Sequence, residues 1–307
     1  REILKEYQKQ GYLWMKILKQ YGFGGILADD MGLGKTLQAI TFLWSEFTAA
    51  EKGKAWRALI VTPASLVFNW ANEIQRFAPD LPVKMVAGTA WERKEMLENI
   101  GEKEVLITSY ELLRRDILFY EKLQFDCEII DEAQYIKNYS TQSAKAVKSV
   151  QAVFRMALTG TPVENRLSEL WSIFDYLMPG FLYGYERFRR EIELPVIQMD
   201  EESAKARLQK MIRPFVLRRL KKDVLKELPD KLEKNVFSKM EGEQRRLYDA
   251  HVRRLQTMLA GQSEREFRGS RIQILAEMTK LRQICCHPGL LYQDYNAGSA
   301  KLETCLE

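Results

Sequence analysis

Short runs of mostly apolar residues alternate with amphipathic stretches along the chain up to residue 160. Each run has the length of a β-strand and is followed by residues typical of turns or helix starts. The six runs are residues 25–28, 58–61, 83–86, 105–108, 128–131 and 156–159. Strands that alternate with helices require crossover connections, and such connections produce a parallel sheet. The pattern therefore predicts an α/β fold with a central parallel sheet flanked by helices.

Helical periodicity is found towards both ends of the chain. Near the N-terminus it predicts a helix with one face mostly in the core, formed by Leu4, Tyr7, Gly11, Trp14, Leu18 and Tyr21. After residue 166 the strand-like runs cease, and residues 244–259 and 272–285 show helical spacing. A chain of 307 residues is long enough for two domains. We therefore expect an α/β lobe followed by mostly helical segments.

A glycine-rich turn follows the first predicted strand. It contains Gly32 and Gly34 and ends in Lys35 and Thr36, where a helix is predicted to begin. The glycines let main-chain N–H groups approach a phosphate, the lysine reaches the β- and γ-phosphates, and the threonine hydroxyl binds Mg²⁺. The strict phosphate-loop pattern has a glycine six residues before the lysine, where this chain has Asp29. Taken alone, the turn is also compatible with an ordinary helix cap.

Polar residues follow the fifth and sixth predicted strands. Asp131 is suited to hold Mg²⁺ through its water shell, and Glu132 to polarise an attacking water, although such a pair is also typical of a charged strand exit. Thr159, Gly160 and Thr161 are suited to lie beside a γ-phosphate or to connect to a second lobe, and alone they are a plain turn. Because ligands bind at the C-terminal ends of parallel strands, we expect these motifs to meet at one edge of the sheet.

Composition narrows the class of protein. Apolar residues make up 46% and charged residues 29% of the chain, as in ordinary globular proteins. No apolar run is long enough to span a membrane, and a net charge of +5 does not by itself indicate nucleic-acid binding. The four cysteines and two histidines form no zinc-binding pattern, and a reducing intracellular compartment fits them. The start at Arg1, with no signal-peptide pattern, suggests an excised fragment.

Together, these motifs resemble the Swi/Snf-type family of DNA-dependent ATPases in helicase superfamily two. The resemblance rests on residues 4–14, 27–36, 61–66 with Asn69 and Trp70, 107–110, 131–134, and 158–162 with Glu164 and Asn165. The string from Asp29 to Thr36 is close to diagnostic of the family, in which Asp29 is the usual residue. Gln134 stands where many members have histidine or another residue, and we interpret it as variation within the family.

The resemblance implies ATP and Mg²⁺ as cofactors and a role for each matching residue. The nucleotide would be bound by Gln8, whose amide suits an adenine edge, and by Asp30, Met31, Gly32, Leu33, Gly34, Lys35 and Thr36. Catalysis would involve Lys35, Asp131, Glu132 and Gln134, with Thr36 and Asp131 at the metal. DNA would contact Pro63, Ser65, Asn69, Thr108, Ser109 and Tyr110, of which Ser65 and Ser109 are also suited to cap helices. Thr159, Gly160 and Thr161 would couple the motifs.

The later part of the chain resembles the region between the two lobes of the family. Residues 218–224 and 228–231 resemble the link between lobes, residues 281–288 a helical insertion, and residues 300–303 the lead-in to the second lobe. We therefore predict a RecA-like ATP-binding lobe at residues 1–166, a helical protrusion and link at 167–235, and the start of the second lobe at 236–307. The arginine-rich motif of the second lobe has no counterpart here, so we expect these 307 residues alone to be nearly inactive.

The function implied by the resemblance is ATP hydrolysis stimulated by double-stranded DNA, with movement along the duplex that remodels protein–DNA complexes. A nucleosome, RNA polymerase or a repair factor would each suit as the target, and no membrane partner is implied. The protein would be nuclear in a eukaryote and cytoplasmic, at the nucleoid, in a prokaryote. Two alternatives stay open: a strand-separating helicase of the same superfamily, and a DNA-binding scaffold that no longer turns over nucleotide.

Overall fold

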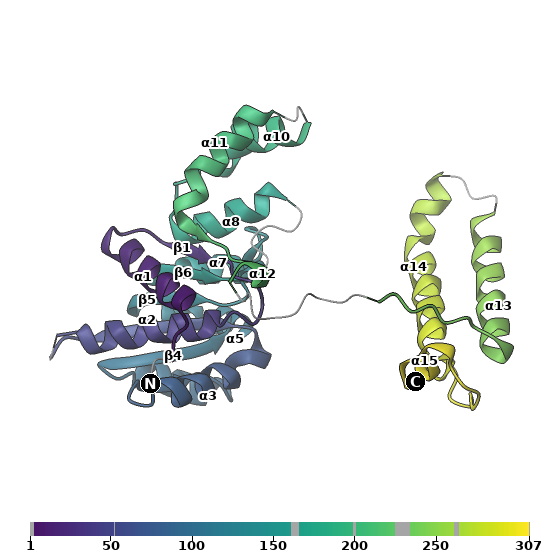
Figure 1. Ribbon diagram of the computed structural model, residues 1–307, viewed down its shortest axis with the longest axis horizontal. Helices are drawn as coiled ribbons and strands as arrows, with labels where there is room; N and C mark the ends of the chain where they lie inside the picture. Colours follow the sequence, from purple (N-terminus) through teal and green to yellow (C-terminus); the bar gives the residue numbers. More distant parts are fainter. Residues whose placement is uncertain are drawn as a thin grey trace. The chain divides into compact units, whose positions relative to one another are not determined.

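The computed structural model describes residues 3–51, 53–160, 166–198, 201–224, 234–260 and 264–306. The chain forms two compact units, Arg1–Pro229 and Asp230–Glu307. Figure 1 shows that the first unit contains the sheet and that the second consists of helices.

A seven-stranded sheet forms the centre of the first unit. The strands are β1 (Gly25–Leu27), β2 (Trp56–Thr62), β3 (Val83–Met85), β4 (Lys103–Ser109), β5 (Gln124–Ile130), β6 (Gln151–Leu158) and β7 (Val216–Leu217). Their order across the sheet is β3-β4-β2-β5-β6-β1-β7, and every neighbouring pair is parallel. The six predicted strands and the parallel sheet are confirmed, and β7 is a further strand that the apolar pattern did not predict.

The inner strands are buried on both faces. β2 pairs with β4 along its whole length, from Trp56 beside Lys103 to Thr62 beside Ser109. Ile60 at the centre of β2 has no exposed surface, as expected for a parallel strand covered by helices on both sides. Because all strands run in the same direction, their C-terminal ends share one edge, where the predicted motifs lie.

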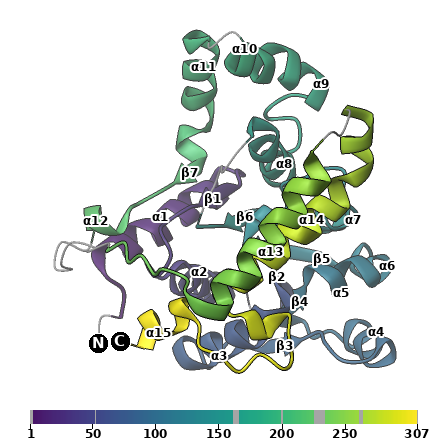
Figure 2. The same cartoon turned by 90° about the vertical axis from the view of Figure 1, so that its right-hand side faces the viewer.

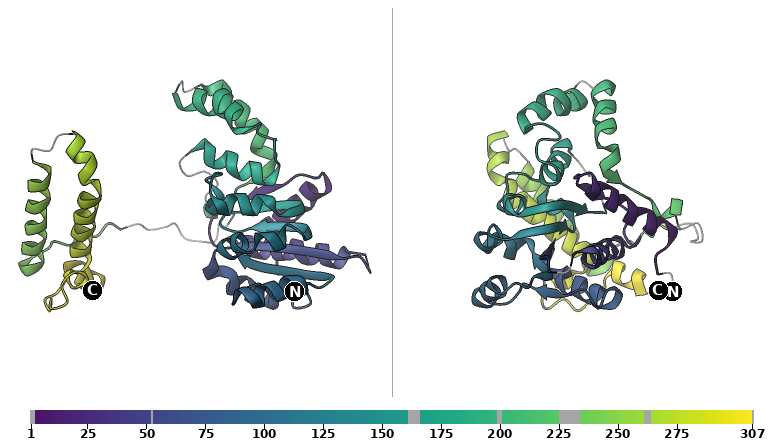
Figure 3. Two further views of the ribbon diagram at one scale, coloured as in Figure 1. Left: turned by 180° about the vertical axis from the view of Figure 1, so that it is seen from behind. Right: turned by 90° about the vertical axis from the view of Figure 1, so that its left-hand side faces the viewer.

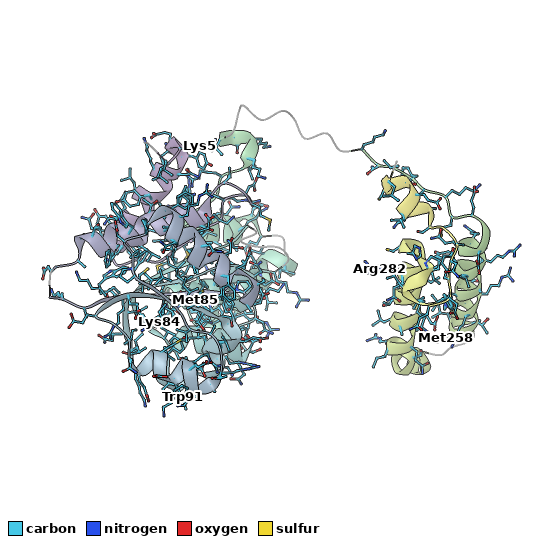
Figure 4. The ribbon with its side chains drawn as sticks, turned by 90° about the horizontal axis from the view of Figure 1, so that it is seen from below. Lys5, Lys84, Met85, Trp91, Met258 and Arg282 are labelled. Carbon is cyan, nitrogen blue, oxygen red and sulfur yellow. The ribbon has the colours of Figure 1, made fainter. Side chains whose placement is uncertain are left out.

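Helices cover the sheet in the first part of the chain. They are α1 (Glu6–Gln20), α2 (Lys35–Ala49), α3 (Val67–Phe77), α4 (Ala90–Glu98), α5 (Tyr110–Arg115), α6 (Ile117–Tyr120), α7 (Gln142–Ser149) and α8 (Leu167–Leu177). α2 packs against both α1 and α3, and α5 packs against α7; Figures 2 and 3 show these helices around the strands. In Figure 4, Lys5 before α1 and Trp91 in α4 lie at opposite ends of this unit, in agreement with the strand order.

The elements after α8 lead the chain away from the sheet and back to it. They are α9 (Tyr185–Phe188), a π-helical turn (Arg189–Glu193), α10 (Leu194–Gln198), α11 (Glu202–Ile212), a 3-10 turn (Arg213–Phe215), β7 and α12 (Lys221–Val224). Phe215 fixes the return, because its ring packs edge-on against Phe23 and Phe181 at 5.2 and 5.0 Å. Residues 167–224 thus share a compact unit with the sheet, while the functional boundary at residue 166 stays a prediction.

The second unit contains α13 (Gly242–Leu259), α14 (Glu264–Cys286) and α15 (Ala300–Leu306). α13 and α14 lie side by side, and Figure 4 marks them by Met258 and Arg282. The buried Gln244 amide joins all three helices, since it donates to Ile284 O at 2.8 Å and accepts from Ala300 N–H at 3.1 Å. The predicted helices are confirmed. Among the described residues, none of the helices has the length and apolar character needed to cross a membrane.

Candidate active site

The phosphate loop, residues 29–36, joins the end of β1 to the start of α2. Gly32 and Gly34 have φ angles of 83° and 76°, in the left-handed region that favours glycine. Gly34 directly precedes α2, which begins at Lys35 as predicted. The unpaired N–H groups of the first helical turn therefore lie at the loop, where an anion is favoured.

The Lys35 side chain turns back towards the start of the loop. Its Nζ donates a hydrogen bond to the main-chain oxygen of Asp29 at 2.7 Å. Burial lowers the pKa of the Lys35 amine, while the carboxylates of Asp29, Glu132, Asp131 and Asp30 oppose that shift. Lys35 is thus a partly desolvated cation with four carboxylates close enough to act on its pKa.

Helix α1 contacts the phosphate loop from another side. Tyr7 Oη and Gln8 Nε2 both donate to the main-chain oxygen of Leu33, each at 3.1 Å. Gln8 Oε1 accepts from the Lys5 N–H at 2.9 Å, and only 6% of Gln8 is exposed. The Gln8 amide therefore binds the loop itself in this structure, and its contact with adenine stays a prediction.

Asp131 follows β5, and two donors orient its carboxylate. Trp70 Nε1 donates to Oδ2 at 2.8 Å, and the Glu132 N–H donates to Oδ1 at 2.9 Å. Burial raises the pKa of Asp131, and both hydrogen bonds oppose this effect. The charges of Lys35 and Asp131 also influence each other's pKa. The two motifs thus lie together at the C-terminal edge of the sheet, as the sequence predicted.

Glu132 has a left-handed main chain, with φ 52°, which is uncommon for a residue other than glycine. Its Oε2 accepts a hydrogen bond from Gln134 Nε2 at 2.6 Å. Gln134 Oε1 in turn accepts from the Thr159 hydroxyl at 3.2 Å. The side chain of Glu132 is thus oriented by a glutamine that is itself bound to the end of β6.

The end of β6 also lies against the phosphate loop. A Cβ atom on Gly160 would come 3.3 Å from Cγ of Met31, whose side chain is otherwise 66% exposed. Asp30 lies one residue earlier, and its main-chain oxygen accepts from the Leu33 N–H at 3.2 Å. Thr161 lies outside the described residues. Thr159 thus contacts Gln134 and Gly160 lies beside Met31, while their predicted role in coupling the motifs stays a prediction.

The six predicted DNA-contacting residues differ in exposure. Ser65 and Asn69 are exposed beyond the C-terminal end of β2. Four others are buried: Pro63, Thr108, Ser109 and Tyr110. The Thr108 hydroxyl, for example, donates to Val86 O at 3.4 Å inside the fold. Only the first two can therefore offer their side chains to a DNA backbone as they stand.

Two of the buried residues have structural partners. The Tyr110 hydroxyl donates to the main-chain oxygen of Asp131 at 2.7 Å, and its ring stacks on Tyr135 with centroids 5.0 Å apart. Tyr110 therefore helps to hold the main chain of Asp131 in place. Ser109 caps α5 by accepting from the Leu112 N–H at 3.2 Å, which confirms its predicted capping role. The corresponding prediction for Ser65 is wrong, because no side-chain cap is formed at the helix that follows it.

Sequence reasoning missed the contact of Arg219 with the start of the phosphate loop. Its guanidinium binds the carboxylate of Asp29, 190 positions earlier in the chain. A charge at the end of an apolar strand requires a partner, so Asp29 itself was a signal. The sequence does not identify that partner, because several arginines of the later segments would serve equally well.

Comparisons with known proteins agree with the fold and the motifs. A model of the family described as SNF2-related domain matches residues 7–290. An uncharacterized ATP-dependent helicase of Mycoplasma genitalium is 38% identical over 282 residues, 92% of this chain and 26% of that protein. The TATA-binding protein-associated factor MOT1 of Saccharomyces cerevisiae is 33% identical over 325 residues, 99% of this chain and 17% of that protein. The chain thus spans about a quarter or less of these relatives.

A solved structure is also similar to this chain in fold and in sequence. The SWI2/SNF2 ATPase core of Sulfolobus solfataricus in complex with dsDNA is similar to this chain with a TM-score of 0.68 and 35% identity. The match covers 99% of this chain and 63% of that one.

Proposed function

Because this chain belongs to the family of SNF2-related domains, we propose that it is the ATP-binding lobe of a DNA-dependent ATPase that moves along double-stranded DNA. The observation that carries the proposal is that the loop with Lys35 follows β1 and that Asp131 and Glu132 follow β5 at the same edge of the parallel sheet. Their carboxylates also act on the pKa of Lys35. Lys35 and the N–H groups at the start of α2 would bind the β- and γ-phosphates. Glu132, oriented by Gln134, would polarise the attacking water.

Mg²⁺ would be held by Thr36 and Asp131. Both supply oxygen ligands, and the Asp131 carboxylate is already oriented by Trp70. Among the described residues there is no group of three or more acidic, histidine or cysteine side chains arranged to hold a metal. Mg²⁺ would take its remaining ligands from water and phosphate, as it usually does in nucleotide sites.

The nucleotide-binding role is tested with Lys35→Ala in the full-length protein. The variant removes a partly buried cation that would face triphosphate charge, and a charge-assisted contact contributes about 1.5–3 kcal/mol. ATP affinity, measured by calorimetry, should fall accordingly, and turnover should be lost. The matched control is Lys145→Ala, because Lys145 is an exposed lysine on α7. Wild-type affinity and turnover in Lys35→Ala would refute the site.

The mode of action on DNA is tested with a triplex substrate, which reports movement along the duplex, and with a duplex substrate, which reports strand separation. Movement along an intact duplex should displace a third strand bound in a triplex, while the duplex strands stay paired. Separation of the duplex strands would instead favour a strand-separating helicase. Absence of DNA-stimulated ATP hydrolysis would favour a scaffold that binds DNA and no longer turns over nucleotide. The solved relative bound to dsDNA supports the first of these outcomes.

A further inference from the structure

The residues around β7 run beside the phosphate loop. We call residues 216–224 the link segment. Beyond the pairing of β7 with β1, the Ala28 N–H donates to Leu217 O at 2.7 Å. The Asp30 N–H donates to Arg219 O at 3.0 Å. The Lys221 N–H in turn donates to Asp30 Oδ2 at 2.9 Å. The link segment thus extends the pairing from the sheet into the phosphate loop.

The Arg219 side chain adds a buried ionic contact. Its guanidinium binds both carboxylate oxygens of Asp29, with Nε 2.9 Å from Oδ1. Nη2 also donates to Gln38 Oε1 at 2.7 Å, and Gln38 Nε2 donates to Asp29 Oδ2 at 3.2 Å. The Asp29 side chain has no exposed surface, and that of Arg219 is 11% exposed. The three side chains therefore form a closed, buried network between the link segment, the loop and α2.

This network reaches Lys35 through Asp29. The carboxylate of Asp29 binds Arg219, while its main-chain oxygen accepts the hydrogen bond from Lys35 Nζ. A buried carboxylate that loses a directly bound cationic partner is costly and must move or take up a proton. A movement of Asp29 would shift the main-chain carbonyl group that binds Lys35, and proton uptake would remove a negative charge beside the Lys35 amine.

We propose that Arg219 is a positioning residue of the phosphate loop, and that the loop binds nucleotide well only while the link segment is docked on it. The inference rests on the proposed ATP site and adds to it a residue and a segment outside the nucleotide motifs. Coupling between two sites is reciprocal, so bound nucleotide in turn holds the link segment on the loop.

The first test compares Arg219→Gln with Arg218→Gln in the full-length protein. Arg218 is the adjacent arginine and is exposed, so it serves as the matched control. Nucleotide affinity without DNA should fall about 5- to 150-fold in Arg219→Gln, the range typical of coupling between two sites, and stay at the wild-type value in Arg218→Gln. Equal affinities in the two variants, both folded by circular dichroism, would overturn the proposal.

A second variant separates positioning from direct contact with the ligand. Arg219→Gln combined with Asp29→Asn removes both charges and leaves no unpaired carboxylate, so nucleotide affinity should recover in part relative to Arg219→Gln alone. If Arg219→Gln alone does not fold, the nucleotide affinity of the double variant is compared with that of the wild type instead. If the double variant bound nucleotide no better than the single one, Arg219 would act directly on the ligand, and its positioning role would be wrong.

A third measurement uses the wild-type protein. Hydrogen exchange at the Asp30 and Lys221 amides, which bridge the loop and the link segment, is recorded with and without a non-hydrolysable ATP analogue. Slower exchange with the analogue is expected, and unchanged exchange at both amides would contradict the coupling. Loss of binding in Lys35→Ala but not in Arg219→Gln would refute this inference alone, whereas retained binding in Lys35→Ala would refute the ATP site itself.

Discussion

Glu128 is a buried carboxyl group in the middle of β5. Its side chain has no exposed surface, and within the described part of the chain neither oxygen has a hydrogen-bond partner. Arg155 Nε on the neighbouring strand lies 3.4 Å away. Burial raises the pKa of Glu128 to about 8, although the Arg155 charge opposes the shift. Folding therefore favours the protonated form of this residue.

This shift predicts how stability depends on pH. Because the pKa is higher in the folded than in the unfolded chain, the stabilisation from Glu128 is complete below about pH 4.3 and is lost as the pH rises towards the folded value. The free energy of unfolding of the wild type should therefore fall relative to that of Glu128→Gln as the pH rises from about 4.3 to about 8. Urea unfolding followed by tryptophan fluorescence reports the first unit, which contains all six tryptophans.

The control for this prediction is Glu102→Gln, since the Glu102 side chain is exposed. It should show the pH profile of the wild type. Identical slopes for the wild type and Glu128→Gln would mean that Glu128 is ionised in the folded protein at neutral pH.

At the scale of elements, α1 contains a glycine where helix propensity disfavours one. Alanine is better than glycine in a helix interior by about 0.5–1 kcal/mol. A Cβ atom on Gly11, however, would lie 1.9 Å from Gln38 Oε1 and 2.9 Å from Arg219 Nη2. The absence of a side chain lets α1 approach the buried network beside the phosphate loop.

Gly11→Ala should therefore destabilise the protein in spite of the propensity. Overpacking typically costs about 1–3 kcal/mol, which exceeds the gain from alanine. Thermal unfolding and nucleotide affinity would both be measured, with Gln10→Ala as the control because Gln10 is the exposed neighbour on the same helix. A Gly11→Ala variant that is more stable than the wild type would show that Gln38 and Arg219 can move without cost.

At the scale of the molecule, hydrolysis is expected to need more than these 307 residues. The chain supplies the phosphate loop, the candidate metal ligands and Glu132, but no arginine motif of the type that stabilises charge on the γ-phosphate. Such an arginine contributes roughly 10³–10⁵ in rate. Phosphate release by residues 1–307 alone should therefore be close to background, with or without duplex DNA.

The comparison for this assay is a longer form of the protein that includes a second lobe. It should hydrolyse ATP faster and respond to DNA. Equal rates for the two forms would show that the site is complete within residues 1–307.

The affinity of the whole molecule for DNA should depend mainly on contacts with the phosphate backbone. A protein that tracks the backbone has weak sequence preference and loses affinity steeply with salt. Affinity for duplexes of unrelated sequence should therefore be similar and fall together from low to physiological salt. Ser65→Ala and Asn69→Ala should each weaken binding by about 1 kcal/mol on every sequence, as for loss of a hydrogen bond.

Ser149→Ala is the control for these two variants, because Ser149 is an exposed serine at the end of α7. A strong preference for one sequence, or binding that is insensitive to salt, would contradict backbone tracking.

The sequence by itself determined the parts of the protein that depend on neighbouring residues. The apolar runs located six strands, because a strand buried on both faces must be apolar along its length. The spacing of Gly32, Gly34 and Lys35 located the phosphate loop, because a turn with left-handed residues before a helix needs glycine. Parallel strands then required that Lys35 and Asp131 lie at the same edge.

Only the tertiary structure decided which distant residues are partners. β7 has two residues and lies beside basic positions, so no periodicity identifies it; it is a strand only because the fold brings it alongside β1. The exposure of Ser65 and the burial of Tyr110 likewise depend on packing. Arg219 finds Asp29 because the fold buries both, and local sequence carries no information about a contact 190 positions away.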